Sequence, residues 1–169
     1  MNVSEVLIEA FDRIPELVRS AVEGLTPEQL RWAPAPGANS IGWLVWHLTR
    51  TQDAHLAEIT GGDQVWVEDG WAERFGLKPD PANTGYGHTT AEIATVRPES
   101  AEALIAYHDA VATRTNELLR DLTPDALDRI VDDSWDPPVT LGVRLISVIN
   151  DDDQHAGQAA YLRGLLPTA

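Results

Sequence analysis

Residues 139–166 read VTLGVRLISVINDDDQHAGQAAYLRGLL, and this stretch does more than any other to decide the fold. Its apolar residues recur at intervals of three and four, which is the spacing of one face of an α-helix. The spacing predicts a helix over about 139–165 that buries one face in a core. The apolar residues of that face are Leu141, Leu145, Val148, Ala159 and Leu162.

Three other segments, residues 3–24, 40–60 and 98–122, show the same helical period. Four helices of roughly twenty residues with little strand signal predict an all-α fold, an antiparallel four-helix bundle. The length of the chain fits one domain, so we expect residues 1–169 to form a single bundle domain.

The segments between the helices are less regular. Residues 26–31 begin with Thr-Pro and predict a short helical turn, and residues 64–77 predict another short helix. Residues 78–97 contain several Gly and Pro and predict a long loop. Loops of this length in compact domains are often functional, so this segment is a candidate part of a site.

The composition excludes several kinds of function. The chain has no cysteine, which rules out disulfides, thiolate metal ligands and a cysteine nucleophile, so any thiol must come from outside. A formal net charge of -15 and the lack of a basic run argue against a nucleic-acid partner. The N-terminal residues lack a basic signal-peptide region, and no long uncharged apolar run suggests a membrane span. We therefore expect a cytoplasmic protein without a membrane partner.

The helical face of residues 139–165 carries polar side chains in its middle. Residues four apart on a helix lie about 40° from each other and residues three apart about 60°. Asp151 and Asp152 therefore both share a face with His155, whereas Asp153 points elsewhere. A buried carboxylate needs a partner, and a divalent metal bound by carboxylate and imidazole supplies one. Either aspartate with His155 is a candidate half-site for a metal.

A third ligand is expected from the helix over residues 40–60. His47 lies at the edge of its apolar stripe and would complete a set of two histidines and one carboxylate. Three protein ligands leave positions open for water or substrate, which is typical of a catalytic site. His55 is as central to the stripe as His47, so spacing alone does not choose between them. His88 reads as a loop residue, and His108 as a core or surface residue of the third long helix.

Two stretches resemble a known family. They are APAPGANSIGWLVWHLTRTQDAHL, residues 33–56, and HAGQAAYLRGLL, residues 155–166. Both resemble the DinB-like superfamily, which includes the mycothiol-dependent maleylpyruvate isomerases and the bacillithiol and mycothiol S-transferases. The more specific motifs are NSIGWLVWHL in the second long helix and DDDQHAGQ in the last one. The order and spacing of the helices extend the resemblance over nearly the whole chain.

The resemblance implies a four-helix bundle, often a homodimer, with a divalent metal held near one end. The first ligand of the family is a histidine of the second long helix, which His47 matches. The other two lie four residues apart on the last helix, where this chain has Asp151 and His155, with Asp152 as the alternative carboxylate. Family members usually have histidine or glutamate in place of Asp151. Zinc is the first expectation for two nitrogens and one oxygen, and nickel is the alternative.

The leading functional hypothesis is a metal-dependent enzyme, a thiol S-transferase or isomerase, acting on a small electrophilic substrate. The metal would bind a low-molecular-weight thiol such as mycothiol and lower its pKa. His55 is a candidate base, and Arg50 and Arg144 are candidates for binding an anionic reactant, although helix arginines are usually exposed. A metal-dependent hydrolase is one alternative. A non-catalytic small-molecule-binding or stress-response protein on the same fold is another.

Overall fold

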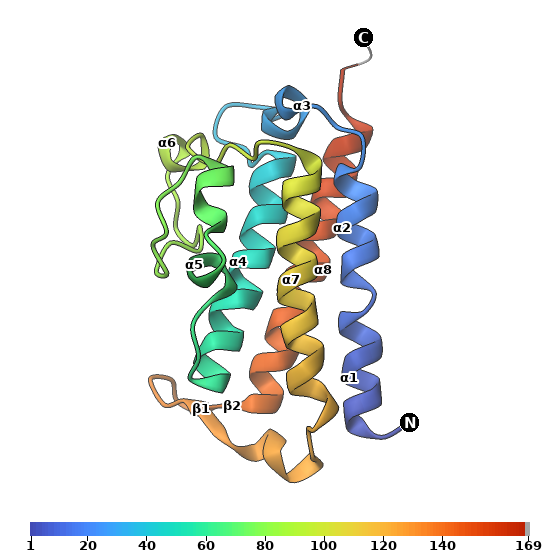
Figure 1. Cartoon of the computed structure of the whole chain (residues 1–169), viewed down its shortest axis with the longest axis vertical. Coiled ribbons are helices and arrows are strands. Elements are labelled where there is room, and N and C mark those ends of the chain that lie inside the picture. The colour runs from blue at the N-terminus through green and yellow to red at the C-terminus, as the bar shows by residue number, and fades with distance from the viewer. Residues whose placement is uncertain (168–169) are drawn as a thin grey trace.

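The computed structural model describes residues 1–167, and four long helical segments form a bundle in it (Figure 1). The first segment is divided into two helices, and each of the other three is a single helix. The prediction of an all-α four-helix bundle is therefore confirmed. The bounds are Val3–Phe11 for α1, Ile14–Val22 for α2, Ile41–Thr60 for α4, Ala101–Arg120 for α7 and Leu141–Gly164 for α8.

Short elements connect the long helices. A two-stranded antiparallel hairpin, in which Ile130 pairs with Thr140 and Asp132 with Val139, precedes α8. The predicted loop over residues 78–97 contains one extra helical turn, α6, whose first turn is closed by a capping box of Thr89 and Glu92. The short elements are α3 (Pro27–Arg31), α5 (Val65–Glu68), η1 (Trp71–Phe75), α6 (Thr90–Ile93), η2 (Pro124–Asp128), β1 (Ile130–Asp132) and β2 (Val139–Thr140).

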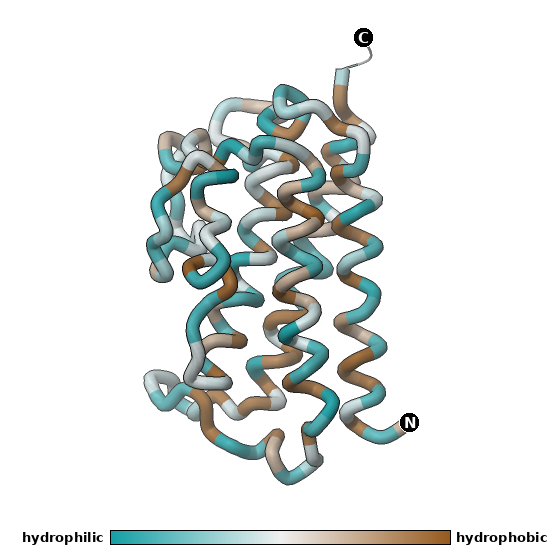
Figure 2. The backbone as a smooth tube through the Cα atoms, in the orientation of Figure 1, coloured by the Kyte–Doolittle hydropathy of each residue, from teal (hydrophilic) through white to brown (hydrophobic). Residues whose placement is uncertain are grey.

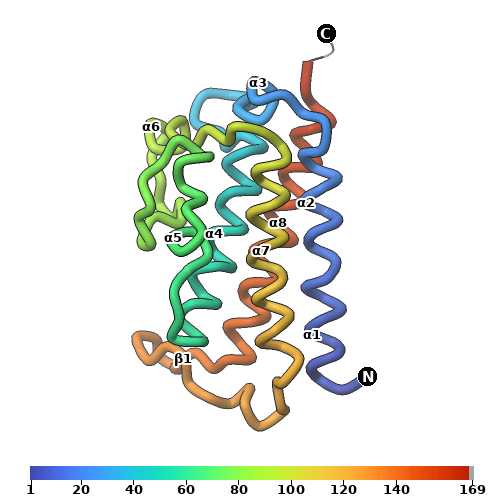
Figure 3. The backbone as a smooth tube through the Cα atoms, in the orientation of Figure 1, coloured from blue at the N-terminus to red at the C-terminus, as the bar shows by residue number. Residues whose placement is uncertain are grey.

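The long helices do not simply alternate in direction (Figure 3). The segment α1–α2 runs in the same direction as α8, and α4 runs in the same direction as α7, because residues 61–100 cross back along the bundle between α4 and α7. We call residues 61–100 the crossover segment. Bundles with one long crossover connection are a known variant of the four-helix fold. The arrangement leaves α4 antiparallel to its main neighbour α8, with the crossover segment beside α4.

The first predicted helix is wrong in one respect, because residues 3–24 form two helices instead of one. α1 ends at Phe11, and α2 begins at Ile14 with Pro15 in its first turn. Proline has no backbone N–H and its ring collides with the carbonyl four residues earlier, so it interrupts a helix but is tolerated at a helix start. The two helices stay nearly in line and together form one side of the bundle (Figure 1).

Apolar and polar residues alternate along each long helix (Figure 2). The apolar ones meet in a single core between α2, α4, α7 and α8, which also includes Trp46, Trp66 and Phe75. Burial of this apolar surface is the main force that holds the helices together. Among residues 1–167, no helix is both long enough and apolar enough to cross a membrane.

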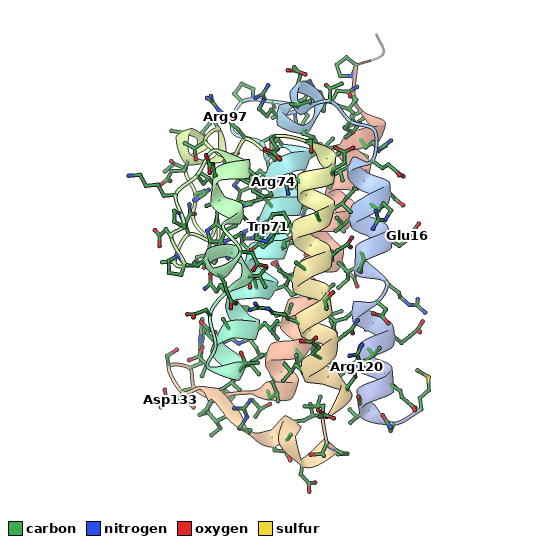
Figure 4. All side chains as sticks on the ribbon, viewed as in Figure 1. Glu16, Trp71, Arg74, Arg97, Arg120 and Asp133 are labelled. Atoms are coloured by element: carbon green, nitrogen blue, oxygen red, sulfur yellow. The ribbon has the colours of Figure 1, made fainter. Side chains whose placement is uncertain are left out.

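The crossover segment is fixed to α4 and α7 by polar and aromatic contacts. Asp53 of α4 accepts hydrogen bonds from Val65 N (2.9 Å) and Trp66 N (2.8 Å), which are otherwise free N–H groups at the start of α5. Trp71 packs against Tyr107 of α7 with ring centroids 5.4 Å apart, and the guanidinium of Arg74 lies over the Trp71 ring (Figure 4). The crossover segment is therefore a folded part of the molecule, and its later residues reach the middle of α4.

Candidate metal centre

The three residues predicted as metal ligands come together at the contact between α4 and α8. His47, Asp151 and His155 each offer a ligand atom, and these atoms all lie within 4.8 Å of one another. His155 Nε2 is 3.5 Å from Asp151 Oδ1, and the two histidine rings meet edge to face with centroids 4.9 Å apart. Two residues four apart on α8 and one residue of the antiparallel α4 thus form one cluster. Helical spacing put Asp151 on one face with His155, whereas the choice of His47 and of Asp151 came from the family resemblance.

Hydrogen bonds fix the two histidine rings in matching tautomers. His47 Nδ1 lies 2.6 Å from the carbonyl oxygen of Thr84, and His155 Nδ1 lies 3.0 Å from Gln158 Oε1. Because these oxygens only accept hydrogen bonds, each Nδ1 carries the proton and donates it. Each Nε2 is left with a lone pair directed into the cluster. Such outer hydrogen bonds to Nδ1 are the usual way in which metal-binding histidines are oriented.

A carboxylate oxygen of the cluster that lacks a hydrogen-bond partner among the described residues also fits a metal site. Asp151 Oδ2 is buried and has no hydrogen-bond partner among the described residues, which is costly for a carboxylate oxygen unless another ligand meets it. Burial lowers the pKa of His47, so this imidazole is held neutral. Asp151, whose Oδ1 is 3.5 Å from His155 Nε2, raises the pKa of His155, so in the metal-free protein a proton competes with a metal for this nitrogen. Two imidazole nitrogens and one carboxylate oxygen are a donor set suited to zinc or nickel.

An aromatic frame surrounds His47. The Trp43 ring stacks on the His47 ring with centroids 4.6 Å apart, and Trp43 Nε1 donates to His88 Nδ1 at 3.2 Å. His88 Nε2 in turn donates to Asn83 Oδ1 at 2.8 Å. His88, which the sequence marks as a loop residue, therefore holds the tryptophan that packs on His47. His88 therefore supports the site through Trp43 and does not belong to the cluster of His47, Asp151 and His155.

The crossover segment packs tightly over the His47 ring at Gly85. This residue has a φ of +93°, and a Cβ added to it would lie 2.9 Å from both His47 Nδ1 and the Trp46 ring. Only glycine adopts this conformation readily and leaves room for the ring below it. The close approach brings the neighbouring Thr84 carbonyl within hydrogen-bond distance of His47. Sequence reasoning missed both Thr84 and Gly85; the available signal was the pair of glycines in TGYGH, residues 84–88.

A cavity of about 460 Å³ opens beside the cluster, and we call it the metal cavity. It lies between α4 and α8 and is covered on one side by the crossover segment. Its size is in the usual range of small-molecule sites. Tyr86 stands at the cavity with 93% of its surface exposed. The lining residues are His47, Thr51, Ala54, His55, Glu58, Thr84, Tyr86, Ser147, Val148 and Asp151.

The remaining sequence candidates lie outside the ligand cluster. His55 lines the metal cavity but pairs through Nδ1 with Glu58 Oε2 at 3.0 Å, so the structure brings His47, and not His55, to Asp151 and His155. Asp152 is completely buried with both oxygens unpaired among the described residues, and burial raises its pKa well above the ordinary range. Asp153 is exposed, as predicted. His108 is buried in α7, where Thr49 is its neighbour.

Neither arginine candidate is free to bind an anionic reactant. The expectation that these helix arginines are exposed is wrong for Arg50, which is fully buried. Its guanidinium donates five hydrogen bonds, to an acid, a phenol, an amide and two backbone carbonyls, and this equals the number of N–H groups it has. Arg144 is partly buried and pairs with Asp132 Oδ2 at 2.7 Å. Neither arginine lines the metal cavity.

Comparison with known proteins finds one matching family model and similar solved structures. A family model described as the DinB superfamily matches residues 10–159. A conserved protein from Enterococcus faecalis, known from its crystal structure, is 32% identical, with a TM-score of 0.89 over 98% of this chain and 97% of that one. A DinB-like protein from Bacillus cereus is 20% identical, with a TM-score of 0.63 over 98% and 96%, and this likeness concerns the fold alone. No curated protein matches the chain.

Proposed function

We propose that this chain, which belongs to the DinB superfamily, is a metal-dependent enzyme. It would use a low-molecular-weight thiol on a small electrophilic substrate. The reaction would be of the thiol S-transferase or isomerase type. His47, Asp151 and His155 are the proposed ligands of a divalent metal, zinc in the first place and nickel as the alternative. One observation carries the proposal: two oriented Nε2 atoms meet a buried carboxylate oxygen that has no partner among residues 1–167, and two of the three residues, His47 and Asp151, line the metal cavity.

The chemistry follows from how these residues are held. A bound divalent metal lowers the pKa of a coordinated thiol, which supplies the nucleophile at neutral pH. Three protein ligands leave positions open, and the cavity of about 460 Å³ beside them offers room for the thiol and its partner. The chain has no cysteine of its own, which agrees with an external thiol. Thr84 and Gln158 keep the two Nδ1 protons in place, so that both Nε2 atoms remain available as ligands.

The first test is metal analysis of the purified protein beside three variants. We expect His47→Ala and His155→Ala each to lose the bound metal, because two ligands hold zinc far less tightly than three. His55→Ala is the matched control, since His55 lines the same cavity without belonging to the ligand cluster, and it should retain the metal. A wild type without affinity for zinc or nickel, or metal retained in the first two variants, would overturn the assignment.

The second test concerns the thiol. Turnover of an electrophile such as 1-chloro-2,4-dinitrobenzene or monochlorobimane should require both an added thiol and the metal, and should stop when a chelator removes the metal. Hydrolytic turnover of ester or amide substrates without any thiol would favour the hydrolase alternative, in which the same site lowers the pKa of water. If the metal-loaded protein binds small molecules but turns over none, the non-catalytic alternative is favoured.

We also propose that the chain forms a homodimer. Val143, Ile146 and Tyr161 lie on the outer face of α8 and are 54%, 59% and 69% exposed. Exposed apolar residues along one helix face are typical of a face that another protein covers. Sedimentation equilibrium of the wild type and of Ile146→Glu tests this, because a charge at the face should dissociate the dimer.

A further inference from the structure

The metal cavity has an unusual charge balance for a site that is proposed to bind a thiolate. Two of its lining residues, Glu58 and Asp151, are acids, and none of the lining residues within residues 1–167 is a lysine or arginine. The whole chain carries a formal charge of -15, so no distant surplus of positive charge compensates this lining. Any cation that helps to bind a reactant must therefore come from the metal or from a side chain close behind the wall.

The first cationic side chain close to the cavity is Arg50, three residues beyond His47, and it has no N–H group free to bind a ligand. It is completely buried, and its five N–H groups are all used. Its Nη1 donates to Asp53 Oδ2 and to Tyr107 Oη, both at 3.3 Å. Its other three bonds go to Gln64 and to the carbonyls of the crossover segment. A ligand would have to break this network to reach Arg50.

The second is Arg144, which stands behind His55. Its Nη2 donates to Asp132 Oδ2 at 2.7 Å, so the charge of Arg144 is balanced, and its Nη1 lies 3.5 Å from His55 Nε2. On the other side of the ring, His55 Nδ1 pairs with Glu58 Oε2 at 3.0 Å. If His55 is protonated, the His55–Glu58 pair is neutral; if His55 is neutral, the pair is negative. In neither state does the wall present a net positive charge.

The remaining charge is that of the metal itself. A divalent ion held by Asp151 and two neutral imidazoles leaves one net positive charge, and one thiolate sulfur balances it. A second negative charge on the reactant would meet Glu58 at the mouth of the cavity, where its side chain is 61% exposed, so the repulsion is modest and sensitive to salt. The other polar groups of the wall are hydroxyls. Ser147 Oγ donates to the carbonyl of Val143, which leaves its lone pairs to accept a hydrogen bond from a ligand.

From these contacts we infer that the metal cavity selects reactants that carry no negative charge apart from the thiolate. The thiol would have hydroxyl groups and no carboxylate, and the electrophile would be uncharged. This selectivity rests on the proposed thiol function and specifies its substrate class. Glu58 is the residue that enforces it, because among residues 1–167 it is the one acid of the wall outside the proposed ligands.

The test uses the chain of residues 1–169 loaded with Co²⁺ in place of zinc, because a thiolate bound to Co²⁺ gives an absorption band in the near ultraviolet. The probes are two pairs of small thiols, 2-mercaptoethanol with mercaptoacetate and 1-thioglycerol with mercaptosuccinate. We expect the uncharged member of each pair to bind about three- to tenfold more tightly at low ionic strength, and the gap to shrink as salt is added.

Two variants isolate the charge of Glu58 from intrinsic differences between the thiols. Glu58→Gln keeps an oxygen that accepts from His55 and removes the charge, so the ratio of affinities within each pair should fall at least about threefold. Glu16→Gln is the matched control: it removes the same charge from α2, at the edge of the bundle opposite the crossover segment (Figure 4). It should leave the ratios unchanged.

Carboxylate thiols that bind as tightly as their uncharged partners would overturn the inference, and so would a ratio that Glu58→Gln does not change. The proposed function fails in a different way. If no thiol of either charge produces the band while Co²⁺ is bound, the site does not bind thiols at all, and the inference that rests on it falls as well.

Discussion

We expect the substitution Gly85→Ala to weaken metal binding without unfolding the protein. The added Cβ would lie 2.9 Å from His47 Nδ1 and from Trp46 Cζ3. Non-bonded atoms of this kind prefer a separation of about 3.5–4.0 Å, so the crossover segment would have to move away from α4. That movement pulls the Thr84 carbonyl away from His47, where the two atoms are now 2.6 Å apart.

Two separable costs set the magnitude. A left-handed backbone costs alanine about 1–2 kcal/mol relative to glycine, and this cost falls on overall stability. Loss of the outer hydrogen-bond partner of a metal-binding histidine typically costs about 10- to 100-fold in metal affinity, which corresponds to about 1.4–2.7 kcal/mol. Gly85→Ala should show both effects. Gly87→Ala should show only the first, because Gly87 has a φ of +73° and nothing lies within 4 Å of its added Cβ.

The assay is competition for zinc between each variant and a chromophoric chelator, with thermal unfolding of the metal-free proteins beside it. Both variants should unfold a few degrees below the wild type, Gly85→Ala at the lower temperature because its Cβ also collides with His47 and Trp46. Their zinc affinities should differ by about tenfold or more, with Gly87→Ala within about threefold of the wild type. Equal zinc affinities in the two variants would refute the claim that close approach of the crossover segment orients His47.

Buried polar groups in the bundle give further tests. Arg50→Lys cannot keep all the hydrogen bonds to the carbonyls of the crossover segment, so its zinc affinity should fall about tenfold in chelator competition. Tyr107→Phe should leave the zinc affinity unchanged and lower the free energy of unfolding in urea by about 1–2 kcal/mol. Burial raises the pKa of Asp152 well above 3.8, so the folded state favours a proton that the unfolded chain loses as the pH rises above that value. Asp152→Asn should therefore raise the thermal midpoint of the metal-free protein at pH 7, and the gain should shrink as the pH falls towards 4. Burial lowers the pKa of His108 from 6.5 to about 4, so the unfolded chain takes up a proton first as the pH falls. The free energy of unfolding should then decrease by up to about 3 kcal/mol between pH 7 and pH 4, and His108→Gln should remove this part of the pH dependence in urea titrations.

The long helices and the ligand cluster were accessible from the sequence because both depend on local periodicity. A stripe of apolar residues every three or four positions predicts a helix, and the same geometry puts Asp151 and His155 on one face. The choice of His47 over His55 needed more, since both lie on the same helix. It came from the family motif, and the structure brings His47 to the pair. The break between α1 and α2 does have a sequence signal, because Pro15 lies within the helical pattern of residues 3–24.

The supporting contacts were not accessible in this way, because they join residues that are far apart in the chain. Thr84 and His47 are separated by 37 positions, and Gln64 and Arg50 by 14. No periodic pattern records a contact between a loop and a helix. Arg50 looked like an exposed helix arginine since nothing in its neighbours shows that the crossover segment would cover it. The same holds for Asp152, which is buried with no hydrogen-bond partner in the part of the chain that the structure describes, unlike an ordinary carboxylate.

The contacts of α4 with the crossover segment form a closed circuit that begins and ends on the same helix. Arg50 of α4 binds the carbonyls of Pro81 and Asn83, and the next residue, Thr84, returns its carbonyl to His47, less than one helical turn before Arg50. The orientation of the proposed ligand is therefore set by the crossover segment as well as by the bundle. Metal binding and the folded position of residues 81–85 are linked: if these residues strengthen metal binding by orienting His47, the bound metal must stabilise them by the same free energy. Changes in the crossover segment can thus tune metal affinity while the bundle core stays intact, which separates the part of the chain that specifies the fold from the part that adjusts the site.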